Sequence, residues 1–263
     1  MSSPDSPAPW WHDFHDDLLA QILLERTCTA EVDRTLDFVV EALELKPGDR
    51  VYDQCCGIGS LSRPLAARGF RVVGCDQAAG YIERARREAE LDERRLDLRY
   101  KAADACAYRP PDAVDGVFNW WTSFGYGESD EVNAKMLACA FDSLRPGGLF
   151  LLDTMNAAGV LRHFQPHMFT RREILGGELC LARESSVDLA AGALDKRWTY
   201  FLPDGRRVTH SSRVRLYQPH ELVRLLRSVG FAEIELFGDI GPKPDVPLTL
   251  DTLRCICRAR RPL

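Results

Sequence analysis

The stretch from Arg50 to Gln77 constrains the fold of this chain more than any other part of its sequence. Apolar residues lead into Asp53, a turn with Gly57 and Gly59 follows, a short helical pattern comes next, and a second apolar run ends at Asp76. This order of strand, glycine turn, helix, strand and acid is typical of a parallel α/β unit. In such a unit the glycines and both carboxylates lie at the carboxyl edge of the sheet, where these sheets bind ligands.

The residue types in this stretch predict an adenosine-bearing ligand. Glycine lets the backbone come close to a bound molecule, and Asp76 is placed to accept hydrogen bonds from the two hydroxyls of a ribose. The dinucleotide fingerprint G-x-G-x-x-G is incomplete, because Ser62 occupies its third glycine position. Asp53 would repel a pyrophosphate and attract an ammonium or sulfonium group. An NAD site is therefore disfavoured, and a glycine turn that only packs a helix is the alternative without a ligand.

Four separated motifs resemble those of class I S-adenosylmethionine (SAM) methyltransferases, and in particular a bacterial group that acts on small molecules. The run DQCCGIG, residues 53–59, resembles motif I of this class, D-x-x-C-G-x-G. The other three motifs are NWWTSFGY (119–126), LRPGGLFLLDTMN (144–156) and RLYQPHEL (215–222). The resemblance extends from about Glu31 to the C-terminus. It departs from the group's pattern at Trp120, Trp121 and Gly127, where the acceptor would sit.

The resemblance implies SAM as the cofactor and assigns residues to its site. Acids and small residues at three successive strand ends would hold the cofactor, together with an amide at the end of the fourth strand. These residues are Asp53, Cys55, Gly57, Gly59, Asp76, Gln77, Asp104, Ala105 and Asn119. Asp104 would face the amino group of the adenine, and an ordinary solvent-facing loop aspartate is the alternative.

A second group of residues is expected to contact the acceptor. Trp120 and Trp121 could face a cationic group through their rings, and packing of both rings into the core is the alternative. Arg215 and Tyr217 are the other expected acceptor contacts. The candidates for a catalytic base or acid are Tyr126, His163, His167 and Tyr217. Each histidine is more typical of an ordinary surface or loop residue than of a base.

The alternation Arg-Val-Arg-Leu-Tyr predicts an anion-binding face. Side chains alternate along a strand, so Arg213, Arg215 and Tyr217 share one face, and Val214 and Leu216 share the other. For Arg213 a solvated ion pair is the alternative. Arg215 opens the RLYQPHEL motif, and an arginine can bind a carboxylate through two parallel hydrogen bonds. We therefore expect an acceptor that bears a carboxylate.

Composition narrows the class of protein. The chain has 263 residues, a mass of 29.6 kDa and a formal net charge of -5, so its charge indicates no general affinity for nucleic acid. Its nine cysteines include no C-x-x-C pair, which favours a reduced, cytoplasmic protein without structural zinc. The first residues show no basic segment followed by an apolar core, and no apolar run reaches membrane-spanning length. We expect neither a nucleic-acid partner nor a membrane partner.

The pattern along the chain predicts a Rossmann-like α/β fold. We expect a seven-stranded, mostly parallel sheet with helices on both faces, in one domain over residues 10–263 that follows a disordered Pro/Ser-rich segment at residues 1–9. Residues 157–217 form a β-rich insertion that covers the site, with three strands expected at 179–187, 194–202 and 207–217. Trp10, Trp11 and Phe14 would either pack a helix onto the sheet or form a lid over the cofactor.

The expected reaction is the transfer of a methyl group to a nitrogen or oxygen of a small molecule. A sulfonium methyl is already activated, so alignment of the reacting atoms supplies most of the acceleration, and a base is needed only for a protonated acceptor. No metal is expected. One alternative is an enzyme that attacks another sulfonium carbon of SAM and releases methylthioadenosine, and an NAD-linked oxidoreductase is a weaker one. A nucleic-acid methyltransferase is weaker still, because the N-P-P-aromatic motif is absent from the sequence.

Overall fold

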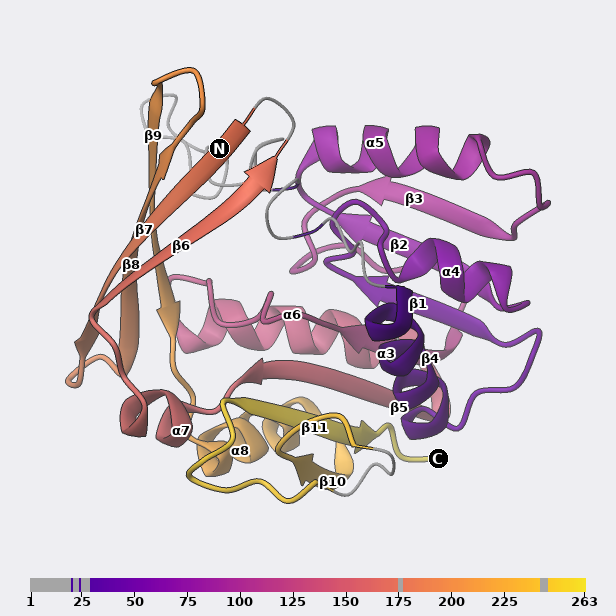
Figure 1. The fold of residues 1–263 in the computed structure, drawn as a ribbon. Coiled ribbons are helices and arrows are strands. Elements are labelled where there is room, and N and C mark those ends of the chain that lie inside the picture. Colours follow the sequence, from indigo (N-terminus) through magenta and orange to yellow (C-terminus); the bar gives the residue numbers. More distant parts are fainter. Residues whose placement is uncertain (1–19, 21–23, 25–28, 175–176, 242–245) are drawn as a thin grey trace, which may run out of the picture.

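The computed structural model describes residues 20, 24, 29–174, 177–241 and 246–263. The expected disordered segment at residues 1–9 and the aromatic residues Trp10, Trp11 and Phe14 lie outside these ranges. The described chain forms two sheets (Figure 1). The larger has seven strands in the order β10-β11-β5-β4-β1-β2-β3, and the smaller has four in the order β6-β7-β8-β9. The Rossmann-like fold class expected from the sequence is confirmed.

The large sheet is mostly parallel. Its strands are β1 (Arg50–Gln54), β2 (Arg71–Asp76), β3 (Leu98–Ala102), β4 (Val114–Asn119), β5 (Leu144–Met155), β10 (Ala232–Phe237) and β11 (Arg254–Arg260). Only β11 runs antiparallel to its neighbours, β5 and β10. The strand order reverses between β1 and β4, and open α/β sheets bind ligands at such a switch point.

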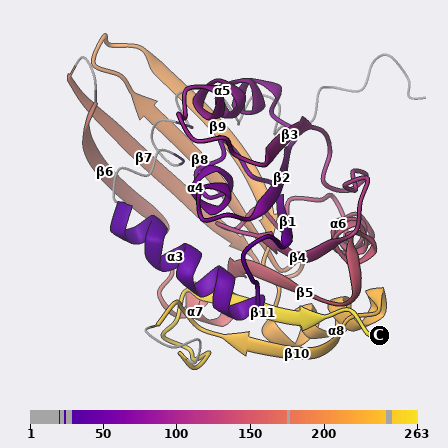
Figure 2. The same cartoon turned by 90° about the vertical axis from the view of Figure 1, so that its right-hand side faces the viewer.

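Helices cover both faces of this sheet. They are α3 (Thr29–Ala42), α4 (Ser62–Ala67), α5 (Ala79–Glu90), α6 (Asp130–Ser143) and α8 (Pro219–Val229). Figure 2 shows α3, α4 and α5 on one side of the strands and α6 and α8 on the other. On each face of the sheet, a cluster of buried side chains packs between the helices and the strands. One cluster lies around Leu36 and Leu65, and the other around Leu137 and Leu226. These cores fix the strand ends in place. No described helix is long and apolar enough to cross a bilayer.

The small sheet is antiparallel and follows a short helix, α7 (Ala157–Arg162). Its strands are β6 (His167–Ile174), β7 (Gly177–Asp188), β8 (Ala193–Phe201) and β9 (Arg207–Arg215). Figure 1 shows it standing across the carboxyl ends of the parallel strands. A tight turn joins β8 to β9, with Gly205 at φ 84° and its N–H donating to the Leu202 carbonyl over 3.0 Å.

The expectation of three strands in this insertion was wrong, because β6 is a fourth. This strand lies at the edge of the sheet, and its side chains from His167 to Arg172 are exposed except for the half-buried Thr170. An edge strand with both faces in solvent has no apolar–polar alternation by which a sequence could reveal it. In the large sheet, β5 begins at Leu144, at the first residue of the LRPGGLFLLDTMN motif, and β4 ends at Asn119.

Candidate cofactor and acceptor site

The loop after β1 contains the backbone conformations that the glycine pattern predicts. Gly57 has φ 56° and Gly59 has φ 78°, in the left-handed region that favours glycine. A Cβ on Gly59 would lie 2.2 Å from the Tyr100 hydroxyl oxygen, so that position has no room for a side chain. Cys55 also has a positive φ, 66°, which a non-glycine residue adopts only at a cost in strain.

Asp76 lies at the end of β2 beside this loop. One of its carboxylate oxygens accepts the Gly57 N–H over 2.9 Å, and the other accepts the Ala78 N–H over 2.9 Å. These bonds hold the glycine turn against the second strand and fix the direction of the carboxylate. The sequence analysis placed Asp53, Gly57 and Asp76 at one sheet edge, and the structure brings them together there.

Asp53 is a buried acid at this edge. Its side chain is 3% exposed and accepts a hydrogen bond from the Ser62 hydroxyl over 2.5 Å. Burial raises the pKa of Asp53 to about 7; the Ser62 hydrogen bond lowers it, and the Asp76 charge raises it further. A cation bound near Asp53 would favour the ionised form of this carboxyl group and so lower its pKa. Ser62, which fills the third glycine position, therefore has a local partner that the sequence analysis did not find.

An amide network joins the ends of β1 and β4. The Asn119 amide nitrogen donates to the Gln54 side-chain oxygen over 3.2 Å, and the Gln54 nitrogen donates to the carbonyls of Ala105 and Met136. The Asn119 side-chain oxygen is buried, with no hydrogen-bond partner among the residues that the structure describes. This orphaned acceptor fits a ligand that donates a hydrogen bond, such as an ammonium. Gln54 was missed because a buried glutamine inside a strand carries no motif signal.

The remaining expected cofactor residues surround this edge. Asp104 is exposed and accepts the Cys106 N–H over 2.8 Å, so it caps its own turn. Gln77 is exposed and Ala105 is buried. The buried acid, the orphaned amide oxygen and the glycine backbone at one sheet edge fit SAM, which carries a cationic methionyl part and a ribose. A direct contact between the cofactor and each of these residues remains a prediction.

Trp120 packs in the core of the protein. Its side chain is 3% exposed, its ring centroid lies 5.9 Å from that of Phe38, and the Arg254 guanidinium covers its ring at 5.0 Å. These contacts favour the packing alternative over the expected acceptor contact, which stays a prediction. The chain turns sharply after β4, where Trp121 and Thr122 have φ values of 57° and 58°.

Trp121 remains half-buried at the strand end. Its N–H donates to a carboxylate oxygen of the buried Asp153 over 3.0 Å, and Arg254 donates to the other oxygen over 2.9 Å. Two successive non-glycine residues in the left-handed region are strained, and such strain concentrates at functional sites. Asp153 and Arg254 therefore hold a strained turn at the point where the acceptor would approach.

Arg215 and Tyr217 are held in a structural network. The Tyr217 hydroxyl donates to Asp130 over 2.6 Å and accepts from the Asn133 amide over 2.9 Å. The Arg215 guanidinium covers the Tyr217 ring at 4.8 Å and pairs with Glu221 over 3.0 Å. It also donates to the carbonyls of Gly192 and Leu216. These contacts favour a structural role over the expected carboxylate contact, because the guanidinium donors are already used.

The two histidines and Tyr126 are not brought together. His163 is exposed beside Asp251, 3.5 Å from its carboxylate, and His167 is exposed at the start of the edge strand β6. Tyr126 instead faces the small sheet, with the Lys196 ammonium over its ring at 5.9 Å. Burial raises the pKa of Tyr126 to about 12, so this phenol keeps its proton at neutral pH. Within the described ranges no group of three Asp, Glu, His or Cys side chains is arranged so that it could hold a metal ion.

The N-terminal part of the chain contacts the glycine loop at two described residues. Ala20 is fully buried and clusters with Ile58 and Tyr81. The Leu24 carbonyl accepts a hydrogen bond from the Ser60 hydroxyl over 2.7 Å, and the Leu24 side chain lies next to Gly57. This contact places residues that precede α3 directly over the expected cofactor loop.

Comparisons with known proteins give one family and several relatives. Residues 51–148 match the family model described as a methyltransferase domain. A ubiquinone biosynthesis O-methyltransferase from Dinoroseobacter shibae is 30% identical over 191 residues, which cover 73% of this chain and 63% of that protein's length. An S-adenosyl-L-methionine-dependent Diels-Alderase, iccD from Talaromyces variabilis, is 34% identical over 113 residues, or 42% of this chain and 37% of its own length.

A solved structure shares the whole fold. The CcbJ methyltransferase from Streptomyces caelestis superposes with a TM-score of 0.80, covers 95% of this chain and 98% of its own, and is 18% identical. The superposition therefore includes the small antiparallel sheet as well as the parallel one, and at this identity it bears on the fold alone.

Proposed function

We propose that this chain, which is a class I SAM-dependent methyltransferase, transfers the methyl group of its cofactor SAM to an oxygen or nitrogen of a small molecule. The observation that carries the proposal is the meeting of Asp53, Asp76 and the orphaned Asn119 oxygen at the switch point of the sheet. The small sheet stands across this edge, so the acceptor would bind between the two sheets (Figure 1).

The residues at this edge would bind and orient the cofactor. Asp76 would accept hydrogen bonds from the ribose hydroxyls while its backbone contacts fix its direction. Asp53 and the Asn119 oxygen would face the cationic methionyl part, and the glycine backbone would allow the cofactor to approach closely. When bound, SAM supplies a methyl group that is activated because its leaving group is a neutral thioether.

The rest of the site would place the acceptor and exclude water. Alignment can supply a large part of the acceleration of such a transfer, so no compact catalytic triad is required. Tyr126, whose pKa is about 12, would hold its proton and could donate a hydrogen bond to the acceptor rather than remove its proton. Trp121, at the strained turn after β4, would line the same space.

Oxygen is the better supported acceptor atom. The Dinoroseobacter shibae relative, whose match covers 73% of this chain, is named as an O-methyltransferase of ubiquinone biosynthesis. The net charge of -5 also favours a small molecule over a nucleic acid. We propose a cytoplasmic location for this chemistry, in line with the eight cysteines of the described ranges, which form no disulfide.

The decisive experiment follows the fate of SAM. The protein is incubated with methyl-labelled SAM and a panel of phenolic, hydroxy and amino metabolites, and every product is identified by mass spectrometry. Methyl transfer gives S-adenosylhomocysteine and a labelled acceptor in equal amounts. Binding of SAM is measured separately by calorimetry, and a protein that binds no SAM would contradict the cofactor assignment as well as the reaction.

A second candidate is a SAM-dependent reaction without methyl transfer. It is favoured by the similarity to a SAM-dependent Diels-Alderase, because a cycloaddition transfers no methyl group. Attack at another sulfonium carbon would instead release methylthioadenosine. The same mass-spectrometric experiment separates the three reactions, since SAM is converted to S-adenosylhomocysteine, converted to methylthioadenosine, or left intact.

A further inference from the structure

The small sheet presents two chemically different faces. Residues paired across antiparallel strands share a face, so Ser185, Lys196 and Ser212 form one cross-strand row. The next apolar row on that face includes Leu194 and Val214, which pack against Met155 and Tyr126 of the body that carries the large sheet. This face therefore points toward the carboxyl edge of the large sheet, and we call it the inner face.

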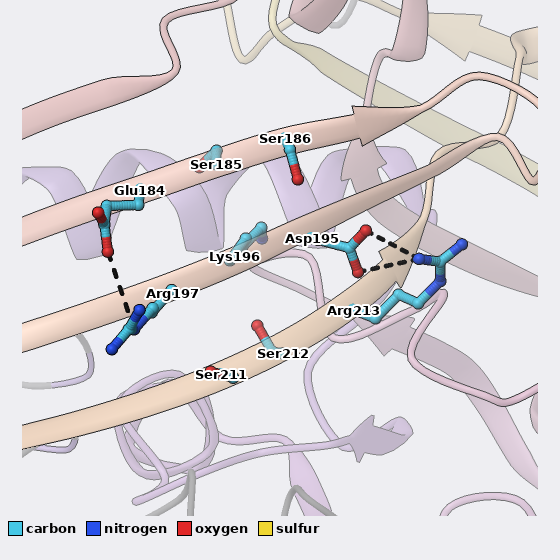
Figure 3. Close-up of a pocket in the computed structure, with 9 residues that line it drawn as sticks. All are labelled: Glu184, Ser185, Ser186, Asp195, Lys196, Arg197, Ser211, Ser212 and Arg213. Carbon is cyan, nitrogen blue, oxygen red and sulfur yellow. Dashed lines mark hydrogen bonds and ion pairs between the residues drawn. The ribbon is translucent and has the colours of Figure 1, made fainter.

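The outer face carries neutralised charges. Figure 3 looks onto it, with the body of the large sheet behind the strands. Arg213 pairs with Asp195 over 2.8 Å and with Asp188 over 2.6 Å, and Arg197 lies 3.8 Å from Glu184. An open hollow of about 470 Å³ lies here, and the residues that line it include Glu184, Asp195, Arg197 and Arg213 together with Lys196 and Ser212 of the row described above. Because both arginines already have carboxylate partners and the hollow lies away from the strand ends, its outer side is no candidate for the acceptor.

Lys196 on the inner face has no such partner. Its side chain is half-buried, and its ammonium contacts the Tyr126 ring; no carboxylate lies within ion-pair distance of it in the part of the chain that the structure describes. Burial, aided by the charge of Arg183, lowers the pKa of Lys196 to about 8. A desolvated ammonium without a counter-ion is costly, so this position favours binding of an anion.

Arg183 is a second cation without a carboxylate on the same face. It stands two residues from Ser185 along β7, and its guanidinium covers the Trp198 ring at 5.4 Å. Its Nε is buried without a hydrogen-bond partner, and so is the Ser212 hydroxyl in the Lys196 row. Among the described residues Arg183 makes no ion pair. Two cations without a carboxylate partner among the described residues, Arg183 and Lys196, therefore lie on the inner face with the unpaired hydroxyl of Ser212.

We propose that Arg183, Lys196 and Ser212 form an anion subsite that binds the carboxylate or phosphate group of the acceptor. An anionic group there would offset the repulsion between the two cations and satisfy the unpaired donors with charge-assisted hydrogen bonds. This proposal agrees with the anionic acceptor expected from the sequence, but it assigns the binding of the anion to the inner face instead of to Arg215. That the anion belongs to the acceptor rests on the proposed function, whereas the binding of an anion does not.

The subsite can be tested with an anionic lysine reagent before any acceptor is known. Pyridoxal 5′-phosphate carries an aldehyde that condenses with an amine, with loss of water, and borohydride reduces the resulting imine to a stable adduct. The full-length protein is labelled in parallel with pyridoxal, which lacks the phosphate, and the modified lysines are quantified by peptide mass spectrometry. The exposed Lys46 and Lys135 serve as internal references.

We expect the phosphate-bearing reagent to label Lys196 about ten-fold faster than pyridoxal does, relative to Lys46, because a cationic pocket concentrates anions. Inorganic phosphate should protect Lys196 but not Lys46. Arg183→Met should remove the preference, and the matched outer-face variant Arg213→Met should retain it. Better protection by 4-hydroxybenzoate than by phenyl phosphate would indicate a carboxylate, and the reverse order a phosphate.

Two results would overturn the subsite: equal relative labelling of Lys196 by the two reagents in the unmodified protein, or no protection by phosphate, 4-hydroxybenzoate and phenyl phosphate. Neither depends on a variant that could fail to fold. Calorimetry with SAM on the same preparation keeps the two proposals separate. Anion-dependent labelling without SAM binding would retain the subsite and reject the proposed function. SAM binding without anion-dependent labelling would reject the subsite and leave the proposed function standing.

Discussion

At the scale of single residues, Asp53 couples the stability of the ligand-free protein to pH. Its pKa is raised to about 7 by burial, so between about pH 4 and pH 7 the folded state holds a proton that the unfolded chain has lost. Stability contributed by this residue therefore falls as the pH rises through that window. In Asp53→Asn the free energy of unfolding should depend less on pH. The difference in this free energy between wild type and variant should change by on the order of 1 kcal/mol per pH unit. Urea denaturation at pH 5, 6 and 7 measures it, and parallel curves would contradict the shift.

Asp76 provides a second prediction at this scale. Asp76→Asn keeps an acceptor oxygen for only one of the Gly57 and Ala78 N–H groups, turns its NH2 group toward the other, and removes the charge that we expect to bind the ribose. SAM affinity should fall by on the order of ten-fold, as about 1.5–3 kcal/mol is typical of a hydrogen bond to a charged group. Calorimetry measures the change. Asp195→Asn on the outer face is the control and should leave the affinity unaltered, and equal affinity in both variants would remove Asp76 from the ribose site.

The sequence predicted that Asp53, Gly57 and Asp76 lie together, because parallel strands must bring their carboxyl ends to one edge, and their contact with the cofactor stays a prediction. It did not predict the directions of side chains beyond those ends. Trp120 follows Asn119 directly, yet the turn with positive φ at Trp121 leaves Trp120 in the core. The inner-face cations were also missed, because the sequence does not show which face of an inserted sheet points inward.

At the scale of elements, Tyr217 ties the segment after β9 to α6. Its hydroxyl bridges Asp130 and Asn133 at the start of α6, and its ring packs against Phe124 with centroids 5.4 Å apart. Tyr217→Phe should lower the free energy of unfolding by about 1–3 kcal/mol, because it leaves the buried Asn133 amide without one acceptor. Urea denaturation tests this, and SAM affinity should be unchanged. A variant with full stability but a raised Michaelis constant for the acceptor would instead return Tyr217 to the substrate site.

The seven-stranded sheet and the order of elements between Arg50 and Gln77 were predicted, since buried strands and amphipathic helices have clear hydrophobic periods. The first strand of the insertion was not, because β6 is exposed on both faces and has no such period. The start of β5 has no strand signal in the sequence either, because its first residues, Leu-Arg-Pro-Gly-Gly, have a composition typical of turns.

At the scale of the whole molecule, the two sheets should differ in local stability. The large sheet is packed between two buried clusters, whereas among the described residues the small sheet shares with the body the cluster around Leu194 and Val214. Strand β6 adds an edge with Met168 and Phe169 exposed at 42% and 55%. We expect backbone amides of β6 to exchange hydrogen at least ten-fold faster than those of β4, because opening needs little loss of buried contact. Hydrogen-exchange mass spectrometry measures this, and equal protection would show that the two sheets open as one unit.

The place where the small sheet joins the body has a consequence for how such enzymes can diversify. The chain leaves the large sheet after Asn156 and returns at Leu216, and Ala157 and Leu216 lie in the same buried cluster. Entry and exit are therefore neighbours, as in chains that tolerate the grafting of whole modules. The small sheet of a relative could be transplanted between Asn156 and Leu216 without disturbing the cofactor loop. Selection could then retune the choice of acceptor while the methyl-donor machinery is inherited intact.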